Sequence, residues 1–345
     1  MSEPTELRDA RATAQALRLA QPEEAAVAAA AARVLEAHAR DGTAALVRFT
    51  AQFDELKLAP SELQLPRAVH AHARKIAPAA LLDGVRATAE RAEAFGRAQR
   101  RTLEDARHEG LRLRWLPRSK VGIYLRRAPS FDAKAFAARV GLARAAGVRE
   151  LVVITPPGRT PTLPGAYGVD PAILATAEEL GVTQLFLGGG AQGVAQLAAW
   201  VGAGGALVGR GGRFARAALR QLAATHAVEL PDVAPRLVLA DSDADRAALV
   251  ALAKLPRMVI VALDAAIAEH VRISDGRVFV ANRDQAVVFA QAFMPARVHL
   301  LVRDAERWLG ELTEASELVV GAAESLDAPP LALFLRAQEI AQSPV

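Results

Sequence analysis

Apolar residues recur at helical spacing through the first third of the chain. In residues 24–39, 42–53 and 81–100 they return every three or four positions, which predicts three helices that each bury one face. Strict alternation begins around Leu111–Trp115, and Val121–Leu125 is an apolar run of the length of a buried strand. The N-terminal third is therefore expected to be mainly helical and to lead into a sheet.

Short apolar runs alternate with amphipathic segments from residue 121 onward. Asp170 followed by Pro171 predicts a helix start, with Asp as the N-cap and Pro in the first turn. Strands are predicted at 151–154, 185–187, 237–240, 258–263, 277–280, 299–302 and 317–320, and helices at 171–180, 193–200, 246–254 and 284–293. This alternation predicts an α/β fold with mostly parallel sheets covered by helices on both faces.

Composition limits the class of protein. The 345 residues, 52% of them hydrophobic, suffice for two domains with sizeable cores. No apolar run reaches the roughly eighteen residues of a membrane span, so no membrane partner is expected. The absence of cysteine excludes disulfides and thiolate metal sites and is compatible with the cytoplasm, the expected location. The net charge of +4 is spread along the chain without a nucleic-acid-binding motif, which argues against a nucleic-acid partner.

One gap-free segment carries a family resemblance. Val121–Glu150 reads VGIYLRRAPSFDAKAFAARVGLARAAGVRE, and LVVITPPG and LFLGGGAQGVAQLAAW follow it. Together these stretches resemble the core of histidinol dehydrogenase. Residues 42–54, 230–241 and 293–302 match further family segments in the same order, so the similarity runs from about residue 33 to about residue 321. The resemblance implies an oxidoreductase of histidine biosynthesis, which oxidises L-histidinol to L-histidine with NAD and zinc.

The family fold is implied as well. It consists of two Rossmann-like domains, the second inserted into the first, with an N-terminal helical arm and a C-terminal tail. The expected boundaries are an arm at 1–28, a first domain at 29–123 and 233–325, a second domain at 124–232, and a tail at 326–345. In the family this tail crosses to a partner subunit, so a homodimer is expected.

The family's cofactor crevice is partly retained. Tyr124 and Gln192 match positions that contact NAD in the family, and the resemblance places four glycines in the loops around it: Gly189, Gly190, Gly209 and Gly211. Gly188–Gly193 also has the spacing G-x-G-x-x-G after a strand and before a helix. The acidic residue that binds ribose about twenty residues later is absent, because residues 208–213 hold only Gly, Arg and Val. NAD therefore remains a candidate cofactor.

The family's metal and base positions have changed. The helix that carries Gln-x-x-His in the family reads DRAALVALAKLPR here, and no histidine follows His299 to supply a late ligand. Asp327 alone stands near a ligand position, so zinc is not expected. The family's Glu-His pair is Ala296-Arg297, which has no group that can accept a proton. His299, two residues on, is the only nearby candidate base, and an ordinary strand histidine is the simpler interpretation.

Arginines replace several residues around the crevice. The family's Pro-Gly-Gly loop is Arg126-Arg127-Ala128 here. Its Gly-Pro-Gly-Asn loop is Gly209-Arg210-Gly211-Gly212, which Arg213 follows. The position of a substrate-binding Ser holds Pro235, which Arg236 follows. Because a guanidinium binds two oxygens at once, Arg126, Arg127, Arg210 and Arg213 suggest a crevice adapted to a phosphate or nucleotide. The alternative is a solvated, Arg-rich surface.

The sequence leaves three functional hypotheses. The first is a divergent family member that has lost zinc-dependent oxidation and has a binding or regulatory role. The second is an active NAD-dependent alcohol dehydrogenase acting on histidinol or a related amino alcohol, which would need His299 or another new base. The third is an anion- or nucleotide-binding protein that uses the Arg-lined crevice.

Overall fold

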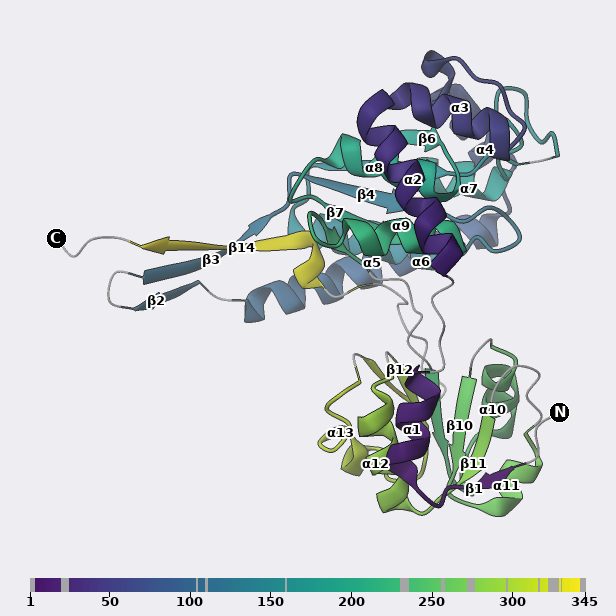
Figure 1. Cartoon of the computed structure of the whole chain (residues 1–345), viewed down its shortest axis with the longest axis vertical. Helices are drawn as coiled ribbons and strands as arrows, with labels where there is room; N and C mark the ends of the chain where they lie inside the picture. The colour runs from purple at the N-terminus through teal and green to yellow at the C-terminus, as the bar shows by residue number, and fades with distance from the viewer. Residues whose placement is uncertain are drawn as a thin grey trace. The chain divides into compact units, whose positions relative to one another are not determined.

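The chain forms two compact units (Figure 1). Unit 1 comprises Met1–Glu23 and Asp232–Ser325, and unit 2 comprises Glu24–Pro231 and Leu326–Val345. The structure is a computed structural model. It describes residues 4–19, 25–103, 105–108, 111–158, 160–229, 236–255, 258–271, 277–295, 297–315, 317–321, 329 and 331–341.

Unit 2 is built on a five-stranded parallel sheet. Its order is β6-β5-β4-β7-β8, from the strands β4 (Lys120–Tyr124), β5 (Glu150–Thr155), β6 (Leu185–Leu187), β7 (Ala206–Gly209) and β8 (Ala227–Val228). The first strand in the chain, β4, lies in the middle. The chain fills one side of the sheet with β5 and β6 and then the other with β7 and β8, so the order reverses between β4 and β7. In doubly wound sheets this is the point where ligands bind.

Helices cover both faces of this sheet. One core packs the strands against α5 (Ala79–Thr102), α6 (Ala133–Ala146) and α7 (Pro171–Glu179). The other packs them against α2 (Ala25–Asp41), α8 (Gly190–Val201) and α9 (Arg213–Leu222). The remaining helical segments of unit 2 are α3 (Thr43–Phe53), the 3₁₀ turns η1 (Pro60–Glu62) and η2 (Leu331–Phe334), and α4 (Arg67–Ile76).

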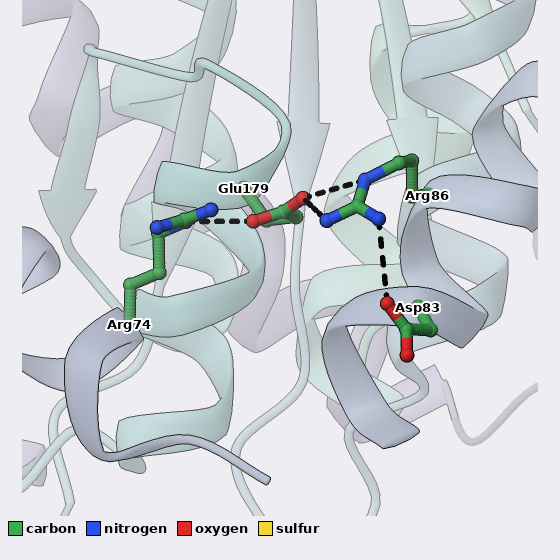
Figure 2. A network of polar contacts seen from close by, with 4 residues as sticks. All are labelled: Arg74, Asp83, Arg86 and Glu179. Atoms are coloured by element: carbon green, nitrogen blue, oxygen red, sulfur yellow. Dashed lines mark hydrogen bonds and ion pairs between the residues drawn. The ribbon is translucent and has the colours of Figure 1, made fainter. Parts of the chain in front are cut away.

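One buried carboxylate joins three of these helices (Figure 2). Glu179, at the end of α7, accepts hydrogen bonds from Arg74 of α4 at 2.6 Å and from Arg86 of α5 at 2.7 Å. Burial raises the pKa of Glu179, but the hydrogen bonds from Arg86 and Arg74 outweigh it and hold that pKa below its usual range. The carboxylate therefore stays ionised and holds α4, α5 and α7 together.

A three-stranded antiparallel sheet also belongs to unit 2. It has the order β14-β3-β2, with β2 (Ala106–His108), β3 (Leu111–Pro117) and β14 (Leu335–Ala341). The seven residues of β14 pair with β3 from Leu335↔Pro117 to Ala341↔Leu111. The described part of the expected C-terminal tail thus pairs with a strand of its own chain.

Unit 1 has a six-stranded parallel sheet with the order β1-β11-β10-β9-β12-β13. Its strands are β1 (Thr5–Glu6), β9 (Arg236–Ala240), β10 (Met258–Ala262), β11 (Arg277–Val280), β12 (Arg297–Leu301) and β13 (Glu317–Val320). One face packs against α1 (Ala10–Leu19), α12 (Arg283–Phe293) and α13 (Glu306–Leu309), and the other against α10 (Arg246–Ala253) and α11 (Ala265–Glu269). Apart from the edge strand β1, its strand order repeats that of unit 2.

The predicted fold class is confirmed: the chain is an α/β protein with mostly parallel sheets in two Rossmann-like units. The division of the chain differs from the expected boundaries, because residues 29–123 lie in unit 2 rather than with 233–325. The N-terminal segment, expected as an arm, packs within unit 1, where β1 pairs with β11 and α1 lies against α12. Among the described helices, none combines the length and the apolar character needed to cross a membrane.

Candidate functional site

The candidate residues of unit 2 gather at the carboxyl edge of its parallel sheet. Tyr124 ends β4 and Gly209 ends β7, and the glycine turn Gly188–Gly193 follows β6. Because neighbouring parallel strands end at the same edge, segments that are far apart in sequence meet here. The structure thus brings together the predicted positions Tyr124, Gln192, Gly189, Gly190, Gly209 and Gly211.

The glycine turn packs closely on its surroundings. A Cβ at Gly193 would lie 2.5 Å from the carbonyl oxygen of Gly188, so these two glycines permit the tight turn from strand to helix. Gly190 has φ +54°, and a Cβ there would lie 2.8 Å from Oε1 of the buried Gln192. The Gln192 side chain therefore folds back over the turn.

Tyr124 closes this turn from the side of β4. Its side chain is buried, and its hydroxyl accepts a hydrogen bond from the backbone N–H of Gly190. Burial raises the pKa of Tyr124, and the bond from Gly190 offsets only part of that effect, so the phenol stays protonated. A Cβ at Gly211 would lie 3.3 Å from the Tyr124 ring, so this glycine lets the loop after β7 pack on the ring.

A cavity of about 150 Å³ opens between β4 and β7, where the strand order reverses. Arg126 and Arg210, on the loops after these two strands, line it. Asp132, at the start of α6, lies in its wall together with the rings of Phe131 and Phe136, and Arg139 lies in its wall on α6. The cavity is therefore a predominantly cationic pocket with an apolar side.

A buried ion pair lies beside the pocket. Arg139 is 3% exposed, and its Nε donates to Oε2 of Glu229 at 2.9 Å while a second guanidinium nitrogen donates to Oε1. The same Oε2 accepts the N–H of Gly209 at 2.7 Å. Gly209 has φ +108°, and a Cβ there would lie 2.1 Å from the carbonyl oxygen of Tyr124, so only glycine fits.

The four arginines of the anion hypothesis do not act as one group. Arg126 and Arg210 line the pocket, whereas Arg127 binds Oδ1 of Asp54 at 3.2 Å. The Arg213 guanidinium lies over the ring of Phe214, 5.1 Å from its centroid. The structure therefore places Arg126 and Arg210 in the wall of the pocket, while Arg127 and Arg213 are not among the residues that line it.

Three charged residues of this region were not predicted as site residues. Arg139 and Glu229 form the ion pair beside the pocket, and Asp54 holds Arg127 beside the glycine turn. The family resemblance includes Asp54 but assigns it no role. Glu229 could have been found from its position, because it directly follows β8 at the carboxyl edge of the sheet, but β8 is only two residues long.

The changed catalytic positions of the family lie in unit 1, at the amino edge of its sheet. Arg297 begins β12, pairs in register with Arg236 of β9, and binds Glu317 of β13 at 2.5 Å. His299 lies further along β12 and is 8% exposed. Burial, and then the charges of Arg297 and Arg236, lower the pKa of His299 to about 4. Pro235, Ala296 and Asp327 lie outside the described residues.

A protonatable base works best when its pKa lies near the operating pH. His299 is therefore neutral at pH 7 but a weak base. Across the part of the chain that the structure describes, no three His, Cys, Asp or Glu side chains come together as metal ligands. Those side chains therefore offer no tetrahedral set for a zinc ion, and the absence of zinc remains a prediction.

Fold and pocket together define the class: an α/β protein of two Rossmann-like units with a pocket at a strand-order switch point. The sequence profile described as histidinol dehydrogenase matches residues 18–255. The chain belongs to the histidinol dehydrogenase family.

Its relatives include histidinol dehydrogenases from two bacteria. The one from Caulobacter vibrioides is 26% identical over 331 residues, which cover 86% of this chain and 75% of the relative. The one from Deinococcus radiodurans is 30% identical over 325 residues, or 84% and 72% of the two chains. The crystal structure of histidinol dehydrogenase from Elizabethkingia anophelis matches with a TM-score of 0.75 at 17% identity, over 90% of this chain and 84% of that one, which supports the fold.

Proposed function

We propose that this family member binds a small anion in the pocket of unit 2 and has a binding or regulatory role in place of zinc-dependent oxidation of L-histidinol. The observation that carries the proposal is that Arg126 and Arg210, on two different loops, both line the cavity at the switch point of the sheet. Guanidinium groups on two separate loops can bind oxygens of one anion from two sides.

The amino edge of the unit 1 sheet supports the second half of the proposal. The residue at the family's histidine position, Arg297, is engaged by Glu317 and stays protonated. The neighbouring His299 is buried and has a pKa of about 4, which makes it a poor proton acceptor for an alcohol. Among the described residues of this edge, His299 is therefore a weak base, and Arg297 and Glu317 are engaged with each other.

An NAD-dependent oxidation is the second candidate, and two residues favour it. Tyr124 and Gln192 match positions that contact NAD in the family, and both are buried against the glycine turn. Chemistry of this kind would still need a proton acceptor near the substrate alcohol. The two candidates differ in one observable, which is NADH formation from NAD and L-histidinol.

Thermal unfolding tests the anion proposal. A ligand that binds only the folded chain increases the free energy of unfolding, by about 2.7 kcal/mol at a ligand concentration of one hundred times Kd. The unfolding temperature rises as a result. We expect sodium phosphate to raise the unfolding temperature above that in sodium chloride of equal ionic strength. Equal unfolding temperatures in phosphate and chloride over the whole concentration series would refute the proposal.

A further inference from the structure

We infer that the pocket between β4 and β7 selects a single phosphate group, as inorganic phosphate or a phosphate monoester, and discriminates against the pyrophosphate of a dinucleotide. The basis is that the chain's own side chains already accept three backbone N–H groups, two at the pocket and one in the glycine turn that packs on Tyr124. This inference rests on the proposed anion-binding function and adds the class of ligand.

The first occupied donor is at the end of β7. The Gly209 N–H donates to Glu229 at 2.7 Å, and Arg139 anchors the same carboxylate. In doubly wound folds the loops at strand ends hold phosphate through such N–H groups. A ligand oxygen at Gly209 would have to displace the Glu229 carboxylate, which is ion-paired with the buried Arg139.

The second occupied donor is at the start of α6, whose N-terminus faces the pocket. Asp132 is the N-cap, and its carboxylate accepts the N–H of Ala135 at 3.0 Å. The positive end of a helix attracts anions, and here a carboxylate of the chain itself already accepts one of its N–H groups. Asp132 also places a negative charge in the pocket wall, which penalises each further negative charge on a ligand.

The third occupied donor lies in the glycine turn that leads into α8. The Gly190 N–H donates to the Tyr124 hydroxyl, and the Asp54 carboxylate lies beside the turn, with Oδ2 3.1 Å from where a Cβ on Gly189 would be. Arg127 holds Asp54 in this place. A pyrophosphate lying along the turn would therefore meet a hydroxyl and a carboxylate where a dinucleotide fold offers N–H groups.

The guanidinium groups of Arg126 and Arg210 are the binding groups that suit a compact anion. The cavity of about 150 Å³ corresponds to about five water molecules and is half the lower limit of typical small-molecule pockets. One tetrahedral phosphate fits such a volume, and because the cavity opens to solvent, the remainder of a larger ligand would lie outside it. Two guanidinium groups can donate hydrogen bonds to several oxygens of one phosphate at once.

Isothermal titration calorimetry of the whole chain tests the inference with inorganic phosphate, ADP and NAD at constant ionic strength. We expect phosphate to bind and NAD to bind more weakly. Arg126→Ala and Arg210→Ala should each weaken phosphate binding by about tenfold or more, since each removes a charge-assisted hydrogen bond. Arg213→Ala, three residues from Arg210 but stacked on Phe214, is the matched control and should change the affinity less than twofold.

A second variant tests the exclusion itself. Asp132→Asn keeps a good N-cap but removes the negative charge from the pocket wall, so the fold is preserved. We expect it to tighten the binding of ADP, which carries the most negative charge of the three ligands, by about threefold or more, with a smaller gain for phosphate.

The outcomes separate the inference from the proposed function. If inorganic phosphate does not bind, both fail. If phosphate binds but NAD binds as tightly or more tightly, the inference fails and anion binding stands. If phosphate affinity is the same in Arg126→Ala, Arg210→Ala and Arg213→Ala, the anion binds elsewhere and the inference fails.

Discussion

The carboxylate of Glu229 makes contacts that no neutral side chain can replace. It neutralises the buried Arg139 and accepts the Gly209 N–H. Glu229→Gln should lower the free energy of unfolding by about 3–5 kcal/mol, because it leaves a buried guanidinium without its counter-charge. Urea unfolding followed by circular dichroism measures this.

Glu150→Gln is the matched control for that substitution. Glu150 pairs with Lys120 at 3.1 Å, but both side chains are at least one third exposed. An exposed ion pair contributes less than about 1 kcal/mol. Equal losses in Glu229→Gln and Glu150→Gln would contradict the view that Arg139 depends on Glu229.

His299 makes the stability of unit 1 depend on pH. Its pKa is about 4 in the folded chain and about 6.5 when unfolded, so between these values the unfolded chain binds more protons. The contribution of His299 is present above pH 6.5 and is lost as the pH falls toward 4. We expect a loss of about 2 kcal/mol in the free energy of unfolding between pH 7 and pH 5.

His299→Leu should remove that part of the pH dependence, which urea unfolding at the two pH values measures. The exposed His270→Asn, in the same unit, is the control and should keep the wild-type difference. A wild-type difference retained in His299→Leu would show that His299 does not titrate as described.

Residue types alone identified part of the site. Tyr124, Gln192 and the glycines could be predicted because the turn and strand around them follow a family pattern. The roles of Asp54, Arg139 and Glu229 could not, because each depends on a partner at least 73 residues away. The separation of Arg127 and Arg213 from Arg126 and Arg210 likewise depends on those partners.

At the scale of elements, α5 and α6 cross at a contact that requires glycine. A Cβ at Gly141 of α6 would lie 2.3 Å from the carbonyl oxygen of Ala89 in α5, whereas one at Gly84 of α5 would meet nothing within 4 Å. Gly141→Ala should therefore destabilise the chain by about 1–3 kcal/mol through overpacking. Gly84→Ala should stabilise it by about 0.5–1 kcal/mol, because alanine favours the helix.

Thermal unfolding of the two variants checks both the predicted destabilisation by Gly141→Ala and the predicted stabilisation by Gly84→Ala. Both substitutions add the same methyl group to a helix, so any difference reports on the space around it. A stabilised Gly141→Ala variant would mean that α5 and α6 can move apart at little cost.

Most strands and helices could be predicted because apolar periodicity is a local signal. The exceptions are informative. The strands β1 and β8 have two residues each and exist through pairing with β11 and β7. The strand β14 has a mixed polar pattern and is defined by its antiparallel register with β3, more than 200 residues earlier. Pairing over such distances leaves no periodicity to read in the strand itself.

At the scale of the whole molecule, two units of the same strand order treat their switch points differently. In unit 2 the switch point holds the pocket of Arg126 and Arg210. In unit 1 the ends of β9 and β12 are bridged by the chain itself: Asp241 accepts the Arg303 N–H at 2.8 Å, and the Arg303 side chain pairs with Asp243. The proposed anion binding therefore belongs to unit 2.

The division into units could not be predicted from the resemblance alone. The α/β alternation and the Rossmann-like character follow from local patterns. Which unit residues 29–123 join depends on contacts of α2, α3 and α5 with α6, α8 and α9, which a one-dimensional pattern does not contain.

The proposed loss of histidinol oxidation is tested by the rate of NADH formation by the purified whole chain with NAD and L-histidinol. The assay is run with added zinc and with a chelator, beside the histidinol dehydrogenase of Deinococcus radiodurans as the positive control. We expect a rate equal to the protein-free blank in both conditions, because no three described His, Asp or Glu side chains come together as zinc ligands and His299 is a weak base. Zinc-dependent NADH formation that the chelator abolishes would contradict it.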